Sequence, residues 1–250
     1  MGVNIPNQSV VNNFGLPPQG KNIRAFLFVT PNNPLGSVYT ATQINDVLHF
    51  CAKYALHVIV DEVYALSIHD PESTFVSVLS MPHPDPERTH FLWGFSKDFG
   101  LSGYRCGVLW SANKEMIDVI NKTLFHPPPA VIQMRLKHII DDTDWLHHEY
   151  FPVLRKRLRQ TYVMARDRLQ QLGLVVHPSS SGIFIWFNAA RYMPDRSKSA
   201  EMWLLQKFVL EKVILIPGDI CESREPGYFR MVFSVNPAEL NEESGAKKRG

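Results

Sequence analysis

The feature that most limits the fold of this chain is the alternation of short apolar runs with helical patterns. Residues 24–30 (RAFLFVT) and 57–60 (HVIV) are apolar on both faces, as are the buried strands of a parallel sheet. Between them, Thr40 is a typical N-terminal cap for a helix. The apolar positions at helical spacing after it are Ile44, Val47, Leu48 and Cys51. Strand, helix and strand in this order predict an α/β fold.

Apolar runs at residues 90–95 and 104–110 predict two further strands of the same sheet. The pattern changes after these strands. Helices are expected at residues 113–124, 130–141 and 152–172. Strands at residues 174–176, 183–187, 213–216 and 228–234, with a helix at residues 200–211, then predict a smaller α+β unit. The basic residues of the helix at 152–172 are interpreted as a solvated face.

A lysine in a glycine-rich stretch follows the apolar run at residues 90–95. Residues 96–107 read SKDFGLSGYRCG, which places Lys97 at a strand end among small residues. A Schiff-base lysine needs a partly desolvated amine, and glycines let the backbone approach a bulky cofactor. Arg105 offers a planar, charged fork for a phosphate. Taken alone, however, Lys97 is more simply interpreted as a surface lysine in a loop.

Polar residues recur at the predicted strand ends, which is where α/β sheets bind ligands. They are Asn33, Asp61 with Tyr64, Lys97 with Arg105, and Arg230 in the segment EPGYFR. Taken one at a time, such residues set turns, remain solvated, lie in the core or form structural ion pairs. The ordered spacing of the whole set outweighs these separate interpretations. Glu62, which follows Asp61, is expected to be structural.

The pattern NPxG … DExY … SK … R … R resembles the aminotransferase class I/II family of fold type I pyridoxal-phosphate enzymes. It is more closely similar to 1-aminocyclopropane-1-carboxylate synthases and their animal homologues, because SKDxGLxGxRxG and EPGxFR are worded as in that subgroup. The resemblance extends from about residue 21 to residue 234. It implies an α/β fold of the aspartate aminotransferase-like, PLP-dependent transferase type. We expect an incomplete large-domain sheet and a smaller α+β C-terminal domain.

The resemblance also divides the chain. Residues 1–23 are unplaced, residues 24–142 form part of the PLP-binding large domain, residues 143–240 hold an interdomain helix and the small C-terminal domain, and residues 241–250 are expected to be a disordered tail. Family members carry a long segment before NPxG that contributes to phosphate binding, cofactor stacking and the dimer. We therefore expect this chain to correspond to a C-terminal portion that lacks the N-terminal segment.

For the cofactor, the resemblance implies a role for each of five residues. Lys97 would form the Schiff base with pyridoxal phosphate and then move the Cα proton of the substrate. Asp61 would pair with the pyridinium nitrogen, and its pKa would be lowered by that positive partner. Asn33 and Tyr64 would hydrogen-bond the phenolic oxygen of the ring. Arg105 would bind the phosphate.

For the substrate, the resemblance implies that Arg230, together with Asn33, holds the α-carboxylate through a bidentate contact. One position departs from the family pattern. A phosphate-binding serine usually stands three residues before the lysine, and here that position is Gly94. Losing its hydroxyl would weaken phosphate binding by about 1–3 kcal/mol if nothing replaces it.

The resemblance implies an enzyme that uses pyridoxal phosphate on an α-amino acid, with S-adenosylmethionine as one candidate substrate. The expected chemistry is that of a lyase, with Cα deprotonation and loss of a γ-leaving group. An aminotransferase or a deaminating β/γ-eliminase is the alternative. An alternative of another class is a catalytically incompetent chain that pairs with a full-length homologue. The full-length form is expected to be a homodimer.

Composition excludes several other classes of function. The formal charge is +2 and no basic stripe interleaves with aromatic residues, so nucleic acid is not an expected partner. No stretch is long and apolar enough to predict a membrane span, and no signal pattern opens the chain, which favours the cytoplasm. Cys51, Cys106 and Cys221 are far apart, and the sequence predicts no metal site.

Overall fold

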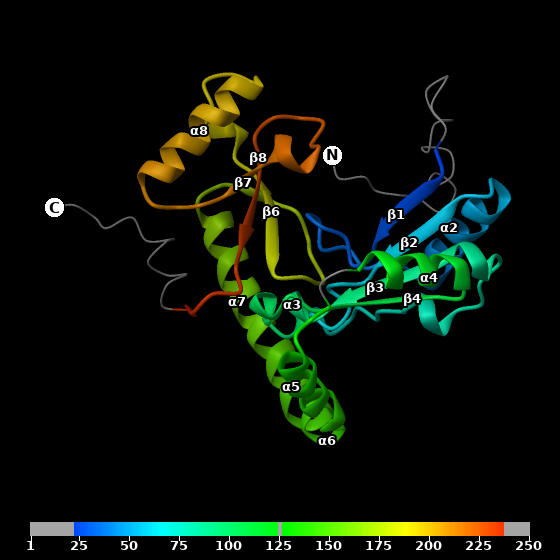
Figure 1. The fold of residues 1–250 in the computed structure, drawn as a ribbon. Helices are drawn as coiled ribbons and strands as arrows, with labels where there is room; N and C mark the ends of the chain where they lie inside the picture. The colour runs from blue at the N-terminus through cyan, green and yellow to red at the C-terminus, as the bar shows by residue number, and fades with distance from the viewer. Residues whose placement is uncertain (1–22, 125–126, 238–250) are drawn as a thin grey trace. The chain divides into compact units, whose positions relative to one another are not determined.

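The computed structural model describes residues 23–124 and 127–237, which form two compact units (Figure 1). Unit 1 contains the described residues up to Pro31 together with Val38–Ile68 and Glu72–Phe151. Unit 2 contains Asn32–Ser37, His69–Pro71 and the described residues from Pro152 onward. The predicted domain limits, residues 24–142 and 143–240, stay a prediction. The predicted tail and all but the last residue of the predicted segment 1–23 lie outside the described residues.

Unit 1 is built on a four-stranded sheet with the order β1–β2–β3–β4. The strands are β1 (Ala25–Val29), β2 (His57–Asp61), β3 (Thr89–Gly94) and β4 (Gly107–Ser111). The first three strands run parallel, and β4 is antiparallel to β3. The apolar runs predicted the first three strands to within one residue.

The fourth strand is shorter than predicted. A 3-10 turn occupies Ser102–Tyr104, and Arg105 follows it with a left-handed backbone at φ 51°. A left-handed residue cannot continue into a ladder of strand hydrogen bonds, so β4 begins only at Gly107. The prediction that a strand starts at residue 104 and includes Arg105 is therefore wrong.

Helix α2 (Ala41–Lys53) covers one face of this sheet. Its capping box is complete, because the Thr40 hydroxyl oxygen accepts from the Gln43 backbone N–H at 3.2 Å and the Gln43 side chain accepts from the Thr40 N–H at 2.9 Å. The helix residues buried against the sheet are Ile44, Val47, Leu48 and Cys51. Their partners on the strands are Phe28, Val58, Val60 and Phe91. The predicted helix and its buried side are confirmed.

The remaining helices of unit 1 are α3 (Phe95–Asp98), α4 (Lys114–Thr123), α5 (Ala130–Asp141) and α6 (Thr143–Trp145). A turn of π-helix, Leu146–Tyr150, follows α6. The segment between β2 and β3 carries two 3-10 turns, Val78–Ser80 and Pro86–Arg88. Glu62 is 1% exposed, and its carboxylate accepts from the Val78 N–H at 2.6 Å. Burial raises the pKa of Glu62 to about 7. Glu62 is thus structural, as expected.

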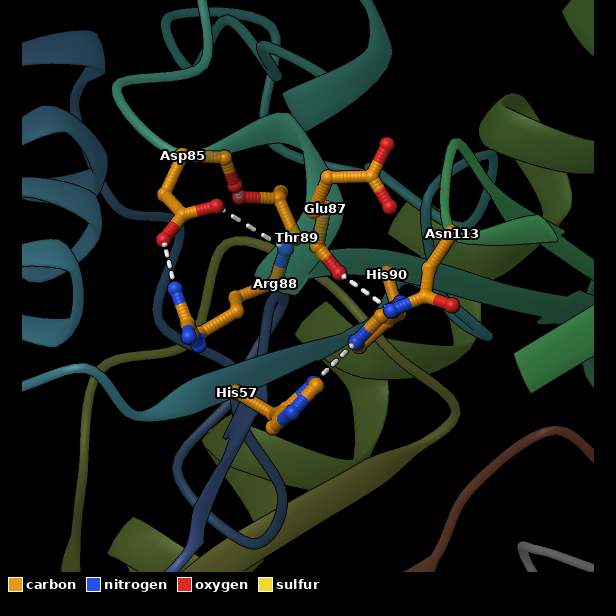
Figure 2. A network of polar contacts seen from close by, with 7 residues as sticks. All are labelled: His57, Asp85, Glu87, Arg88, Thr89, His90 and Asn113. Carbon is orange, nitrogen blue, oxygen red and sulfur yellow. Dashed lines mark hydrogen bonds and ion pairs between the residues drawn. The ribbon is translucent and has the colours of Figure 1, made fainter. Parts of the chain in front are cut away.

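A row of polar side chains crosses the sheet at the end of β2 opposite to Asp61. Figure 2 shows its first two members, His57 and His90. The ring nitrogens His57 Nδ1 and His90 Nε2 lie 2.8 Å apart, and His90 Nδ1 lies 2.7 Å from the Ser111 hydroxyl. Ser111 also accepts from the Asn113 N–H at 3.0 Å. Burial, with His57 nearby, lowers the pKa of His90. The row joins β2, β3 and β4 through side chains as well as through backbone hydrogen bonds.

Unit 2 contains a second sheet with the order β5–β6–β8–β7, in which all neighbours are antiparallel. The strands are β5 (Val175–Val176), β6 (Phe184–Asn188), β7 (Ile216–Pro217) and β8 (Tyr228–Val232). Its helices are α7 (Phe151–Gln171), of which all but the first residue belong to this unit, and α8 (Lys198–Leu210). The smaller α+β pattern predicted for this part of the chain is present. β6 has the expected length, β5 and β8 are shorter than expected, and β7 shares only residue 216 with the strand predicted at residues 213–216.

The core of unit 2 lies between this sheet and the two helices. Its members from α7 and α8 are Leu158, Tyr162, Ala165, Leu169, Ala200 and Leu204. They pack on Ile185, Phe187 and Phe229 of the sheet. Leu172, the last residue of the helix predicted at residues 152–172, lies beyond the end of α7 and is 44% exposed. None of the helices in the described ranges could cross a membrane.

Candidate functional site

The predicted site residues of unit 1 follow the carboxyl ends of two neighbouring strands. Asp61 is the last residue of β2, where it pairs with Leu92 of β3. Tyr64 lies in the turn after β2, and Lys97 lies in α3, which begins directly after β3. Because β2 and β3 are parallel, their carboxyl ends fall at the same edge of the sheet. The fold thus brings these three positions to one edge of unit 1.

Asp61 is a half-buried carboxylate without a cationic partner. Its Oδ1 accepts from the Val63 N–H at 3.0 Å, and no ion pair involves it within the described ranges. Burial raises the pKa of Asp61, although the Val63 hydrogen bond acts in the opposite direction. A carboxylate in this situation is stabilised by a cation or by an additional N–H donor. The expectation that a positive partner lowers its pKa stays a prediction.

Lys97 is half-buried, and its ammonium has neither a hydrogen-bond acceptor nor an ion-pair partner in the part of the chain that the structure describes. A lysine in this state is held back from full hydration and carries no competing contact. Both properties favour an amine that reacts with a carbonyl group.

Asp98, the neighbour of Lys97, is the functional-site residue that sequence reasoning missed. Its side chain is 0% exposed and accepts from Ser67 Oγ at 2.6 Å, Trp93 Nε1 at 2.9 Å and the Leu66 N–H at 3.1 Å. Burial raises the pKa of Asp98 to about 6, against the effect of these three donors. The carboxylate ties the segment after β2 to the helix that carries Lys97, and so fixes the backbone on which the lysine stands.

Aromatic residues support the same helix from its C-terminal side. The Tyr150 hydroxyl donates to the Asp98 carbonyl at 3.0 Å, and the Phe99 and Tyr150 rings stack at 5.1 Å with an interplanar angle of 8°. The local sequence FSKDF, with Ser96 and Lys97 directly before Asp98, gives no clear signal that this carboxylate is buried. Its hydrogen-bond partners are as much as 32 residues away and follow no local pattern.

The other unit 1 positions differ in exposure. Tyr64 is buried, whereas Arg105 is exposed and donates through Nη1 to the Ser102 carbonyl at 3.1 Å. At Gly94, a Cβ atom would meet the Cys106 carbonyl oxygen at 3.4 Å and the Gly107 Cα at 3.6 Å. These are ordinary contact distances, so packing does not require the glycine that stands where the family usually has serine.

In unit 2, the structure brings together the two residues predicted to bind substrate. Arg230 of β8 donates from Nη1 to Asn33 Oδ1 at 2.7 Å, although the two residues are 197 positions apart. The guanidinium lies over the Phe184 ring at 5.6 Å. Arg230 Nε is buried and has no hydrogen-bond partner in the described chain. A buried N–H of this kind lacks an acceptor, which a planar anion such as a carboxylate would supply.

Comparison with protein families matches residues 15–243 to the model described as aminotransferase class I and II. The chain is 36% identical over 218 residues to the human 1-aminocyclopropane-1-carboxylate synthase-like protein 1, covering 86% of this chain and 44% of that protein. It is also 36% identical to the human "Probable inactive 1-aminocyclopropane-1-carboxylate synthase-like protein 2", covering 86% and 38%. With 1-aminocyclopropane-1-carboxylate synthase 6 of Oryza sativa subsp. japonica, identity is 33%, covering 87% and 41%.

The chain thus spans less than half the length of these relatives. Among solved structures, the aspartate aminotransferase from Thermus thermophilus with maleate matches with a TM-score of 0.75 and 19% identity, covering 88% of this chain and 55% of that chain. The aromatic aminotransferase from Pyrococcus horikoshii OT3 matches with a TM-score of 0.75 and 24% identity, covering 88% and 58%. The predicted aspartate aminotransferase-like α/β fold is confirmed.

Proposed function

Because the chain belongs to the aminotransferase class I and II family, we propose that it carries the lysine-bearing part of a cytoplasmic pyridoxal-phosphate enzyme that acts on an α-amino acid. The predicted family is confirmed by the family model and by the identity to named relatives. The observation that supports the proposal most is the state of Lys97, which is half-buried, has no polar partner among the described residues, and stands beside the buried Asp98 at a strand end.

The side chains of unit 1 suit pyridoxal phosphate in their chemistry. Within the described ranges, the Lys97 nitrogen has no polar partner and is available to the aldehyde, and Asp61 has no cationic partner and so suits a protonated ring nitrogen. Arg105 supplies an exposed guanidinium for a phosphate, with one of its nitrogens already on the Ser102 carbonyl. When bound, the cofactor supplies a ring that draws electrons from the substrate Cα.

The chain's own residues then divide the work of binding and proton transfer. Lys97 would hold the cofactor through its side-chain nitrogen, and the same nitrogen would accept the Cα proton of the substrate. Asp61 would hold the ring nitrogen in its protonated form, and Tyr64 would donate a hydrogen bond to the phenolic oxygen. Arg230 holds the α-carboxylate by Nε and Nη2, because its Nη1 is already bound to Asn33. The contact of Asn33 with the cofactor ring stays a prediction.

The reaction outcome that we propose is the lyase chemistry of a 1-aminocyclopropane-1-carboxylate synthase, with S-adenosylmethionine as the candidate substrate. Support comes from the names of the relatives in human and rice. It also comes from the motifs around Lys97 and Arg230, SKDxGLxGxRxG and EPGxFR, which resemble those of the synthase subgroup. Transamination and deaminating elimination are the alternatives, since both begin with removal of the same Cα proton.

One human relative is named "Probable inactive", so activity itself has to be tested first. The measurement is deuterium exchange at the Cα of S-adenosylmethionine, of alanine and of aspartate.

A second candidate is supported by the exposed apolar surface of β4, on which Val108, Leu109 and Trp110 are all exposed. Large apolar side chains on an edge strand favour association with another chain. This supports a dimer, either of this chain or with a longer homologue, in which this chain need not be the catalytic partner. Sedimentation of the purified chain alone and with such a homologue distinguishes the two assemblies from a monomer.

The first prediction concerns Lys97. After incubation with pyridoxal phosphate, reduction with borohydride and digestion, mass spectrometry should find the pyridoxyl group on Lys97 in the wild type. Lys97→Ala should lose this label, because Lys97 is the lysine that follows the carboxyl end of β3. Lys114→Ala, which removes an exposed lysine of the same unit, is the matched control and should keep the Lys97 label. Label scattered over several lysines would contradict the assignment.

A further inference from the structure

The loop that carries Asn33 lies between β1 and α2 in the sequence, yet Asn32–Ser37 belongs to unit 2. The loop is closed on itself, since Gly36 donates to the Asn32 carbonyl at 2.8 Å and the Asn32 N–H donates to the Ser37 carbonyl at 2.9 Å. Arg230, the partner of Asn33, is in the same unit. The geometry of the Asn33–Arg230 pair is therefore set inside unit 2 alone.

Three donors hold this loop from one side, and all meet at the Gly36 carbonyl. They are the Ser180 N–H at 3.0 Å, the Ser181 N–H at 3.1 Å and the Ser181 hydroxyl at 3.0 Å. Gly36 has φ +67°, and a Cβ atom there would lie 1.9 Å from Ser179 Oγ and 2.6 Å from the Ser181 carbonyl oxygen. Only glycine fits this backbone and this approach. The contact between Gly36 and residues 179–181 is therefore close, and it requires glycine at position 36.

The segment Ser179–Ser181, here named the serine anchor, is itself fixed on its other side. The Ser179 N–H donates to the Tyr162 hydroxyl at 3.1 Å, and the Ser180 carbonyl accepts from the N–H groups of His69 at 3.0 Å and Asp70 at 3.1 Å. Tyr162 is a buried core residue of α7. The serine anchor thus connects the core of unit 2 to the loop that carries Asn33.

We propose that Ser181 and Gly36 are positioning residues that hold Asn33 beside Arg230, so that unit 2 carries a preformed subsite for a carboxylate. The inference rests on the proposed function, in which this carboxylate is that of the amino-acid substrate. Ser181 is 0% exposed, and its hydroxyl donates to no group other than the Gly36 carbonyl in the described chain. Its role acts through Asn33, and Ser181 itself touches no substrate.

The subsite takes a planar anion and needs no residue of unit 1. Asn33 occupies Arg230 Nη1, and the buried Nε still lacks an acceptor. A carboxylate oxygen on Nε, with the second oxygen on Nη2, completes the hydrogen bonding of the guanidinium. It follows that the full chain binds simple carboxylates in the absence of pyridoxal phosphate, and that the serine anchor determines how well it does so.

The test is a titration of the full chain, without cofactor, with propionate as the probe. The readout is the NMR signal of the Arg230 Nε–H, assigned by its loss in Arg230→Lys. Ser181→Ala should weaken propionate binding about fivefold, the order expected when one positioning hydrogen bond is removed. The matched control is Ser223→Ala, which removes a hydroxyl bond to a backbone carbonyl at 2.8 Å in the same unit, and it should bind as the wild type does.

Each other result overturns the inference. These results are an unchanged affinity in Ser181→Ala, an equal loss in Ser223→Ala, or no response of the wild-type Arg230 signal to propionate. If Ser181→Ala does not fold, Ser181→Cys, which keeps a weak donor at this position, replaces it and should show a smaller loss than fivefold.

The inference and the proposed function can fail separately. If propionate binding depends on Ser181 but no pyridoxyl group appears on Lys97, the carboxylate subsite stands and the cofactor assignment fails. If Lys97 is labelled but Ser181→Ala binds propionate as tightly as the wild type, the cofactor assignment stands and the positioning role of Ser181 fails.

Discussion

At the scale of single residues, Lys97 and Asp98 show how neighbours in one short helix divide two tasks. The Asp98 carboxylate is fully buried and accepts from three donors, whereas the Lys97 ammonium has no partner in the described chain. The hydrogen bonds that fix α3 are therefore made by Asp98, and the lysine remains available. Asp98 is expected to govern both the stability of unit 1 and the position of the reactive amine.

Replacing Asp98 with alanine tests this division. The change leaves Ser67 Oγ, Trp93 Nε1 and the Leu66 N–H without their acceptor in a buried site. We expect the free energy of unfolding to fall by about 3 kcal/mol or more, since each buried donor left unpaired costs on the order of 1 kcal/mol. Urea denaturation of Asp98→Ala against the wild type measures the difference.

The control is Asp118→Ala, which removes an exposed carboxylate from α4 of the same unit. We expect it to change stability by less than about 0.5 kcal/mol. If Asp98→Ala is as stable as Asp118→Ala, the three hydrogen bonds do not support α3. The extent of pyridoxyl labelling on Lys97, measured in the same Asp98→Ala protein while it remains folded, should also fall.

At the scale of elements, local pattern and long-range contact set different limits on what the sequence reveals. The apolar runs of β1, β2 and β3 predicted the positions of these strands closely. The expectation that both faces are buried is wrong for β1, in which Leu27 is 58% exposed. The strand predicted from residue 104 failed because the left-handed backbone at Arg105 follows from the turn before it, and hydropathy does not report such a turn. Asp98 was missed for a related reason, since its acceptor role depends on Ser67 and Leu66 in a distant segment.

The candidate site divides in the same way. The positions of Lys97 and Asp61 at strand ends followed from pattern alone, whereas the pairing of Asn33 with Arg230 was implied only by the family resemblance. No local rule connects residues that are 197 positions apart. The serine anchor was not foreseen at all, because three consecutive serines with loop-forming neighbours read as an ordinary turn.

Helix α2 gives the prediction at this scale. Thr40→Ala removes the hydroxyl that accepts from the Gln43 N–H and thereby breaks the capping box. We expect a loss of about 1 kcal/mol in the free energy of unfolding, the usual cost of an N-cap. Thermal or urea denaturation measures it. Thr42→Ala, an exposed position in the first turn of the same helix, should show no loss, and equal losses in both variants would exclude capping as the cause.

At the scale of the whole molecule, each unit contains a buried histidine that makes the stability of the fold depend on pH. His69 of unit 2 is 3% exposed, and its ring lies 4.6 Å from the Tyr162 ring in a tilted arrangement. Burial, together with the charge of Arg159, lowers the pKa of His69 to about 4, although Asp70 acts in the opposite direction. In unit 1 the pKa of His90 is lowered as well, chiefly by burial.

These histidines should make the folded chain less stable in acid. Below pH 6.5, unfolded histidines take up protons that the folded chain does not accept, so the His69 contribution is lost as the pH falls from about 6.5 to about 4. At pH 4 the loss from His69 is about 3 kcal/mol. His69→Phe keeps the ring contacts and removes the titration, so its advantage over the wild type should grow by this amount between pH 8 and pH 4.

The pH dependence of stability must be compared between His69→Phe and the wild type, because two buried acids change the stability with pH in the opposite direction to His69. Burial raises the pKa of Glu62 to about 7 and that of Asp98 to about 6, so their contributions favour the folded chain as the pH falls. Both acids are present in the wild type and in His69→Phe, and they cancel in the difference. The exposed His49, changed to Gln, is the control, and a similar pH-dependent gain there would contradict the burial argument.

The sequence positions of the partners of the Asn33 loop determine when this loop can form its contacts during translation. Gly36 and Ser181 are 145 positions apart, and Asn33 and Arg230 are 197. A ribosome releases the chain from its N-terminus, and domains form as their residues emerge. Every residue assigned to unit 1 is released before Pro152, whereas the partners of the Asn33 loop, Ser181 and Arg230 of β8, are released later. The carboxylate subsite is therefore among the last parts of the described chain to be completed during translation.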